Sequence, residues 1–233
     1  MMQNLLSSPI MKILIVVAHP DDESLGAGGT LAKYSQQGAE IKGMYFTNGI
    51  SARFENESSN KLRRINAENV STILGFKWIF QGDFPDNQLD KVPLLELVKK
   101  IEEIKTEFNP DLIFTHSAVD LNVDHRKIAE AVLTAFRPQP QESYTEILSM
   151  EIPSATDFGN VSFFGTFAPN VYVNIEETWV LKKRSLEQYQ DEMRQAPNTR
   201  SIEGLENLAK FRGFQVGLRM AEAFQSLRRI ERN

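Results

Sequence analysis

The sequence predicts an α/β fold in which a mostly parallel sheet is covered by helices on both faces. Short apolar runs alternate with segments of helical periodicity, a pattern that indicates consecutive β-α units. The first run, residues 12–18, is continuous and rich in β-branched residues, as in strands buried on both faces. Polar residues directly follow several of these runs, and open α/β sheets bind ligands at the carboxyl ends of their strands. We therefore expect an active site at that edge of the sheet.

The alternation of apolar runs and helical segments continues to residue 136. The predicted strands cover residues 12–18, 41–46, 76–80 and 111–115, and the predicted helices cover 28–37, 61–74, 94–108 and 124–136. Gly38 and Gly75 are expected to end two of these helices, because glycine readily adopts the left-handed conformation that closes a helix. Gly26, Gly28 and Gly29 are expected to form a turn that opens the first helix.

A Pro-rich break at residues 137–141 separates this core from the rest of the chain. After the break we expect strands over 144–152 and 170–175, a loop over 158–169, and long helices over 176–194 and 202–229. A flexible leader is expected over residues 1–10. The remaining residues, 11–233, are expected to form a single domain in which 142–233 pack on the core formed by 11–136.

Composition and charge exclude several classes of protein. The formal net charge of −5 argues against bulk nucleic-acid binding, which normally requires a basic face. The chain has no cysteine, so disulfides, thiolate metal ligands and a cysteine nucleophile are excluded. No apolar tract reaches the roughly 18 residues of a membrane span, and residues 1–10 lack the basic and apolar regions of a signal peptide. We therefore expect a soluble, cytoplasmic protein.

Histidine occurs three times, each time after a predicted strand or in a loop at a strand end. His19, His125 and Asp22 form a set of two imidazoles and one carboxylate that suits zinc and leaves a fourth position open. Hydrolysis requires such an open position, because zinc activates water there. Asp21, next to Asp22 but expected to face another way, fits the base that takes the proton of that water.

The spacing by itself also leaves a structural interpretation open. An isolated histidine is more often part of the packing than a metal ligand. Asp124, directly before His125, is suited to capping the helix that starts there, because aspartate is a common N-cap residue.

Three segments resemble the PIG-L/LmbE-like family of zinc-dependent N-deacetylases. They are Ala18-His19-Pro20-Asp21-Asp22-Glu23 followed by Gly28-Gly29-Thr30, the segment Asp120-x-Asn122-x-Asp124-His125-Arg126, and the ending with Gly213, Gly217 and Ala221-Glu222-Ala223-Phe224. The resemblance covers nearly the whole chain from Met11. It implies a Rossmann-like three-layer α/β sandwich, which agrees with the order of elements above.

The resemblance also implies roles for individual residues. His19, Asp22 and His125 would be the ligands of a Zn²⁺ cofactor, and Asp21 would be the general base. Asp124 would orient His125 or a nearby imidazole from outside the ligand set. Members of the family remove N-acetyl groups from amino sugars on several kinds of carrier, and they often assemble into small homo-oligomers.

Two positions depart from the family pattern. Many relatives have histidine where this chain has Asn122, and an amide can donate a hydrogen bond but cannot supply the proton of an imidazolium. Asp21 could instead return its proton to the leaving amine, and His116 or zinc could hold the oxyanion. Asn66 stands where relatives often carry a glutamate.

Four further residues are candidates for contacts with substrate, each with an alternative interpretation. Arg63 resembles a family arginine that contacts the polar carrier of the substrate, or else it is a solvated charge on a helix. Arg126 could pair with Glu23, contact an acyl or phosphate group, or lie exposed. Asn48 and Asp83 lie in predicted loops after strands and could bind sugar hydroxyls or only form turns.

The sequence thus predicts a zinc-dependent hydrolase that removes an N-acetyl or similar small N-acyl group from an amino sugar or sugar conjugate, nucleotide-linked ones included. Two alternatives stay open. One is a sugar-nucleotide-binding module of the same fold that has lost catalysis at Asn122, and the other is an amidase acting on a thiol-precursor glycoside conjugate. The expected partner is a small-molecule N-acetylamino sugar, with no nucleic acid and no membrane span.

Overall fold

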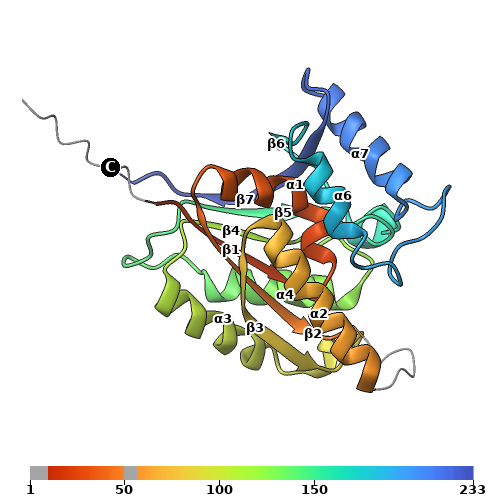
Figure 1. Cartoon of the computed structure of the whole chain (residues 1–233). Helices are drawn as coiled ribbons and strands as arrows, with labels where there is room; N and C mark the ends of the chain where they lie inside the picture. The colour runs from red at the N-terminus through yellow and green to blue at the C-terminus, as the bar shows by residue number, and fades with distance from the viewer. Residues whose placement is uncertain (1–9, 50–56, 233) are drawn as a thin grey trace, which may run out of the picture.

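The apolar runs of the sequence form one seven-stranded sheet in the order β3-β2-β1-β4-β5-β7-β6 (Figure 1). The computed structural model describes residues 10–49 and 57–232. Its strands are β1 (Lys12–Val17), β2 (Glu40–Thr47), β3 (Lys77–Phe84), β4 (Leu112–His116), β5 (Glu146–Met150), β6 (Val171–Asn174) and β7 (Ala221–Arg229). Its helices are α1 (Asp22–Gln36), α2 (Glu57–Leu74), α3 (Leu94–Phe108), α4 (Val123–Ala135), α5 (Val161–Phe164), α6 (Trp179–Leu186) and α7 (Ile202–Phe214), with a 3₁₀ turn, η2, over Leu89–Lys91.

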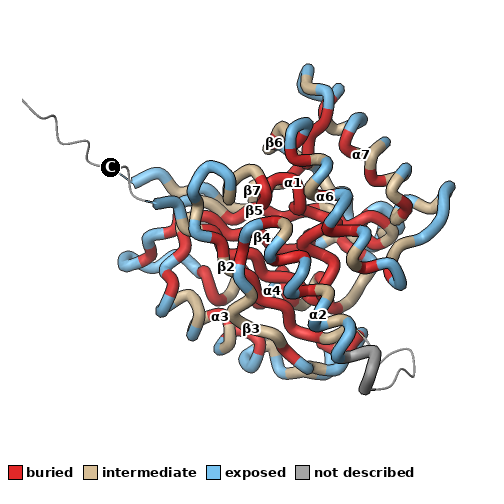
Figure 2. The backbone as a smooth tube through the Cα atoms, in the orientation of Figure 1, coloured by how far each residue is buried: buried red, intermediate tan, exposed pale blue. Residues whose placement is uncertain are grey.

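Strand β1 lies in the middle of the parallel part of the sheet, where it pairs with β2 on one side and β4 on the other. Its side chains alternate between two apolar cores. Ile13, Ile15 and Val17 pack with α1, α2, α6 and α7, while Leu14 and Val16 pack with α3 and α4. The buried centre between these helical layers is visible in Figure 2. The predicted α/β class, with a mostly parallel sheet covered on both faces, is therefore confirmed.

Several predicted boundaries are also confirmed. Helix α3 has the predicted bounds, and β1, β2 and β4 begin and end within one residue of the predicted strands. These elements have strong apolar periodicity and are closed by clear breakers such as Asn109, which adopts the left-handed conformation at the end of α3. No described helix has the length and apolar character needed to cross a membrane.

The start of the first helix differs from the prediction. Helix α1 begins at Asp22, so Gly26, Gly28 and Gly29 lie inside it rather than in a turn before it. The reason is close packing: a Cβ atom on Gly26 would lie 2.6 Å from Sδ of Met150, and one on Gly29 would lie 2.8 Å from Cβ of Ile175. The glycines therefore bring α1 against β5 and the residue that follows β6.

The prediction of one long helix over residues 202–229 is wrong beyond Phe214, where α7 ends. Gly217 has φ of +76°, which ends the helical turn, and the following residues form β7. Strand β7 inserts between β5 and β6 and pairs antiparallel with both (Figure 1). This pairing satisfies the backbone of three strands at once, and it outweighs the helical pattern of the segment.

Other differences are smaller. The helix predicted over 176–194 is confined to α6, and β3 extends to Phe84, so that Asp83 lies in a strand instead of a loop. The loop predicted over 158–169 contains the short helix α5. Residues 1–9 of the predicted leader and residues 50–56, which precede α2, lie outside the described residues.

Candidate active site

A cavity of about 590 Å³ lies at the carboxyl ends of the parallel strands, where the loops after β1, β3 and β4 meet a segment that follows α6. The cavity is mostly polar, with acidic residues, arginines and imidazoles along its walls. Its lining includes His19, Asp21, Asp22, Arg63, Asp86, Asn122, His125, Ser154, Glu192 and Arg200.

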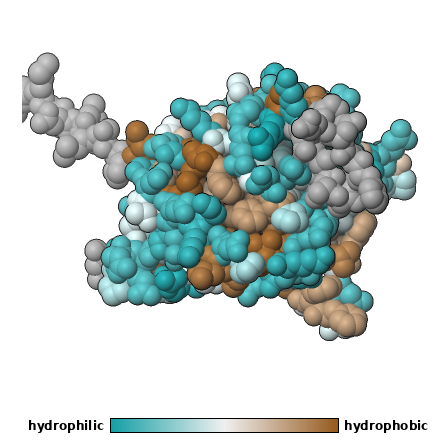
Figure 3. Space-filling view, turned by 90° about the horizontal axis from the view of Figure 1, so that it is seen from below, coloured by the Kyte–Doolittle hydropathy of each residue, from teal (hydrophilic) through white to brown (hydrophobic). Residues whose placement is uncertain are grey.

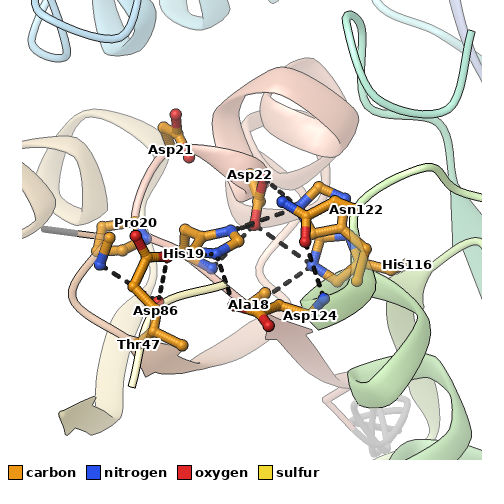
Figure 4. A network of polar contacts seen from close by, with 12 residues as sticks. Ala18, His19, Pro20, Asp21, Asp22, Thr47, Asp86, His116, Asn122 and Asp124 are labelled. Carbon is orange, nitrogen blue, oxygen red and sulfur yellow. Dashed lines mark hydrogen bonds and ion pairs between the residues drawn. The ribbon is translucent and has the colours of Figure 1, made fainter. Parts of the chain in front are cut away.

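Three of these side chains form a compact cluster of potential metal ligands (Figure 4). Nδ1 of His19 lies 3.1 Å from Oδ2 of Asp22, and Nε2 of His125 lies 3.4 Å from Oδ1 of Asp22. The two imidazole nitrogens, Nδ1 of His19 and Nε2 of His125, are 3.3 Å apart. Donors that bind one zinc ion tetrahedrally at about 2.0–2.1 Å stand roughly 3.3 Å apart. The three donors therefore fit a single cation.

The fold explains why these residues meet. His19 follows β1, Asp22 is the first residue of α1, and His125 lies in the first turn of α4. Because β1 and β4 are parallel neighbours, the loops after them lie at the same edge of the sheet. The sequence prediction that residues far apart in the chain meet at this edge is thus confirmed.

Carboxylates lie against the outer nitrogens of both imidazoles. Nε2 of His19 is 3.1 Å from Oδ1 of Asp86 and 3.2 Å from Oδ2 of Asp124. Nδ1 of His125 is 3.1 Å from Oδ2 of Asp120. Such contacts fix which nitrogen of a histidine faces a metal and make the ring a better donor.

One of these carboxylates, Asp124, was expected beside an imidazole, and the other two were not. Asp124 contacts the nearby imidazole of His19, and its two oxygens also accept from the backbone of Asn87 and Leu89. Asp120 lies against His125 instead. Sequence reasoning gave no role to Asp120 or Asp86, although Asp120 belongs to the same motif as His125.

Burial disfavours the charged form of His125, yet the carboxylates of Asp22 and Asp120 outweigh this effect and raise its pKa to about 9. Burial likewise opposes the ionisation of Asp22, but the neighbouring imidazoles of His125 and His116 hold its pKa well below the usual range. The cluster therefore keeps Asp22 as a carboxylate.

Asn122, not Asp124, is the N-cap of α4. Its side-chain oxygen accepts a hydrogen bond of 2.8 Å from the backbone N–H of Asp124. The residue also lines the cavity, and because the oxygen is used by the cap, the amide nitrogen is the part of the group that can donate to a ligand.

His116 lies behind the cluster and is fully buried. Its Nε2 accepts a hydrogen bond of 2.8 Å from the backbone N–H of Ala18, and its ring stacks on that of His125 at 4.0 Å. Burial and the charge of His125 lower the pKa of His116 to about 4, so the ring is neutral. The neutral ring of His116 packs against His125, and its Nε2 is occupied by the backbone. The predicted contact between His116 and the substrate is therefore not supported.

Asp21 is turned away from the cluster, as Figure 4 shows. Its φ of +134° is unfavourable for a residue with a side chain, and such strain is found where surrounding contacts enforce it. Burial and the charge of Asp22 raise the pKa of Asp21 to about 6, although Arg200 and Arg63 oppose the increase. This value suits a group that takes and releases a proton near neutral pH.

Glu23 is fully buried, does not line the cavity, and holds the backbone of Asp21. Its carboxylate accepts the backbone N–H of Asp21 at 3.0 Å and the hydroxyls of Ser24 and Tyr189 at 2.9 and 3.0 Å. Burial raises the pKa of Glu23 to about 7. The strained turn at Asp21 is therefore fixed by side chains from α1 and from the segment after α6.

Arg63 reaches the cavity from α2 and is not a solvated charge, since its side chain is only 12% exposed. It contacts Glu192 at 2.6 Å and the carbonyl of Pro20 at 3.1 Å. Glu192 and Arg200 were not identified from the sequence. They lie more than a hundred residues beyond Arg63 in a stretch with no local motif.

The remaining predicted residues lie outside the cavity lining in the described part of the chain. Arg126 donates to the carbonyls of Asp120 and Leu121 at 2.7 and 2.6 Å and does not pair with Glu23. Asp83 is exposed on β3, and Asn48 is half-buried after β2. Asp86, three residues beyond Asp83, lines the cavity instead of Asp83 and Asn48.

The sheet and the cluster of His19, Asp22 and His125 define an α/β protein with a metal-type site at the carboxyl ends of its strands. A sequence model of the PIG-L family, described as GlcNAc-PI de-N-acetylase, matches residues 14–136, just over half of the 233 residues. The chain therefore belongs to the PIG-L family.

Comparisons with individual proteins agree with this family. The chain is 26% identical over 227 residues to the diacetylchitobiose deacetylase of Thermococcus kodakarensis, covering 93% of this chain and 83% of that protein. It superposes on the N,N'-diacetylchitobiose deacetylase of Pyrococcus horikoshii with a TM-score of 0.73 and 22% identity, over 94% of this chain and 84% of that one.

A further solved structure shows that the fold does not fix the reaction. GalB, the 4-carboxy-2-hydroxymuconate hydratase of Pseudomonas putida, superposes with a TM-score of 0.74 and 19% identity, over 96% of this chain and 99% of that one. The function of this chain must therefore be argued from its site.

Proposed function

We propose that this protein is a metal-dependent N-deacetylase, with zinc as the metal, that removes an N-acetyl group from an amino sugar or sugar conjugate. The observation that carries the proposal is the division of roles between two adjacent carboxylates in one cavity. Asp22 lies between the imidazoles of His19 and His125, while Asp21 is turned away and has a raised pKa. The similarity to a diacetylchitobiose deacetylase supports an amino sugar as substrate.

Zinc held by His19, Asp22 and His125 would supply Lewis acidity toward the acetyl carbonyl and toward water. Asp21 takes a proton from water as the water oxygen attacks the acetyl carbon. The amide nitrogen of Asn122 donates a hydrogen bond to the oxygen that becomes negative. When the C–N bond breaks, Asp21 returns the proton to the amine nitrogen, so that the products are acetate and the free amino sugar.

The cavity fits a sugar with part of its carrier. Its volume of about 590 Å³ is within the usual range for small-molecule sites. Leu121 and Phe158 line it with side chains that are 48% and 53% exposed, so apolar surface lies beside the polar floor. This combination suits the apolar face and the hydroxyls of a pyranose ring.

Metal removal is expected to abolish activity reversibly. Acetate release should be measured over a panel of N-acetylamino sugars, free, nucleotide-linked and conjugated, before and after dialysis against a chelator. We expect activity to fall to background and to return when one equivalent of Zn²⁺ per chain is added, because the three donors fit one cation.

Two results would contradict the proposal. One is acetate release that persists in protein shown by elemental analysis to contain no metal. The other is tight binding of panel members to zinc-loaded protein without acetate release, which would favour the sugar-nucleotide-binding module. Release of product from a thiol-precursor conjugate alone would instead assign the narrower amidase activity.

The Asp120→Asn variant is expected to bind zinc about 10- to 100-fold more weakly than the wild type, because the Asp120 carboxylate lies against the outer nitrogen of His125. Competition with a coloured chelator measures this affinity without reference to activity. Asp157→Asn serves as the control, since Asp157 is exposed and is not among the residues that line the cavity. An unchanged affinity in Asp120→Asn would show that His125 does not need this carboxylate.

A further inference from the structure

Two arginines converge on the same oxygen of Asp21. Nη1 of Arg200 lies 3.3 Å from Oδ2 of Asp21, and Nη2 of Arg63 lies 4.0 Å from the same atom. For both arginines the contact with Asp21 is to Oδ2, and Asp21 lines the cavity. The two oxygens of this carboxylate therefore have different surroundings.

Arg200 is held in place by several contacts of its own. Its Nε donates to Oγ of Ser154 at 2.9 Å and to the carbonyl of Pro153 at 3.4 Å. Its backbone N–H donates to Oδ1 of Asn198 at 2.8 Å. Ser154 has φ of +66°, a conformation that a serine adopts only where its surroundings enforce it. The guanidinium is thus positioned before any ligand binds.

Arg63 is fixed from the other side. Nη1 contacts Oε1 of Glu192 at 2.6 Å, and Nη2 donates to the carbonyl of Pro20 at 3.1 Å. The side chains of Arg63 and Arg200 are 12% and 15% exposed, so solvent screens their charges only weakly. Asp21 therefore lies beside two arginines that are far apart in the sequence.

We propose that Arg200 is a positioning residue for Asp21: with Arg63 it holds Oδ2, so that Oδ1 faces the cavity and is the oxygen that takes and returns the proton. This inference rests on the proposed function, in which Asp21 is the base. Arg200, Ser154 and Glu192 all lie outside residues 14–136, the part of the chain that matches the family model. Arg200 therefore comes from a part of the chain that the family model does not match.

The test compares Arg200→Gln and Arg200→Lys with wild type. For Arg200→Gln we expect kcat to fall about 10- to 100-fold, because a misplaced base loses this much, while KM changes less than about threefold. Arg200→Lys should retain more activity, since an ammonium supplies the charge but not the Nε contact to Ser154. Zinc content should stay at the wild-type value in both variants.

Arg184→Gln is the matched control, because Arg184 is exposed on α6 and should leave kcat unchanged. Millimolar guanidinium should restore part of the kcat lost in Arg200→Ala and should not change the kcat of Arg184→Ala. A purely structural role of Arg200 would not produce this recovery. The double variant Arg63→Gln/Arg200→Gln should lose less than the product of the two single losses, because both residues act on one oxygen.

An unchanged kcat in Arg200→Gln would overturn the proposal, and so would a higher KM at constant kcat, which would assign Arg200 to substrate binding. Crystal structures of wild type and Arg200→Gln provide a test that does not depend on activity: the Asp21 carboxylate should rotate in the variant, and an unmoved carboxylate would overturn the proposal. If wild type releases acetate from no member of the panel, the proposed function fails, while these structures still decide whether Arg200 orients Asp21.

Discussion

Asp21→Asn is expected to lower kcat for acetate release by a factor of about 10²–10⁴, the usual contribution of a general base. The amide has nearly the shape of the carboxylate but cannot accept the proton of the attacking water. Zinc should remain bound, because Asp21 is turned away from the cluster of His19, Asp22 and His125 (Figure 4). Steady-state kinetics and elemental analysis of the same preparation measure both quantities.

Asp90→Asn is the control for this substitution, since Asp90 is an exposed aspartate in the 3₁₀ turn η2. Its kcat should match that of wild type. Near-normal kcat in Asp21→Asn, with zinc at one per chain, would remove Asp21 from the base role. Loss of zinc together with activity would mean that the residue acts through the metal site instead.

Lys182→Met is expected to lower the free energy of unfolding by about 3–5 kcal/mol, the usual effect of removing one partner from a buried ion pair. Nζ of Lys182 lies 2.6 Å from Oε1 of Glu222, and both side chains are 5% exposed. The pair joins α6 and β7 to the backbone of α1. Lys182 donates to the carbonyl of Leu25, and Glu222 accepts the N–H groups of Gly29 and Thr30.

The substitution leaves the Glu222 carboxylate buried without its cation. Urea unfolding measures the loss, and the double variant Lys182→Met/Glu222→Gln should recover part of it because no unpaired charge remains. Lys210→Met is the control on an exposed pair, Lys210 with Glu206 on α7, and should change stability by less than about 1 kcal/mol. Equal losses in Lys182→Met and Lys210→Met would show that the buried pair is not a main support of α1.

Figure 3 shows one face on which hydrophilic residues cover most of the area, with smaller hydrophobic areas between them. The apolar residues of β1 are fully buried between the two cores, so the strand that precedes the site is held on both sides. This burial holds β1 in place beneath the cavity.

The parallel part of the sheet could be predicted from the sequence, and so could the meeting of His19, Asp22 and His125 at its edge. The run at residues 12–18 has the composition of a doubly buried strand, and the position of His19 and Asp22 directly after it is a local property of the chain. The same holds for His125 in the first turn of α4. Strand ends in a parallel sheet share one edge, so the meeting of these residues follows from the alternation of elements.

Other features depend on contacts between residues that are far apart in the chain. Residues 221–229 have a helical pattern, yet they form β7 because β5 and β6 both offer unpaired edges there. The glycines of α1 are explained by Met150 and Ile175, which are distant in sequence. Asp86 and Arg200 have no local signal that separates them from ordinary turn or surface residues, and the motif that contains Asp120 does not say which side chain its carboxylate contacts. Their roles arise from contacts across the chain, which depend on how the layers pack and not on the spacing of residues along it.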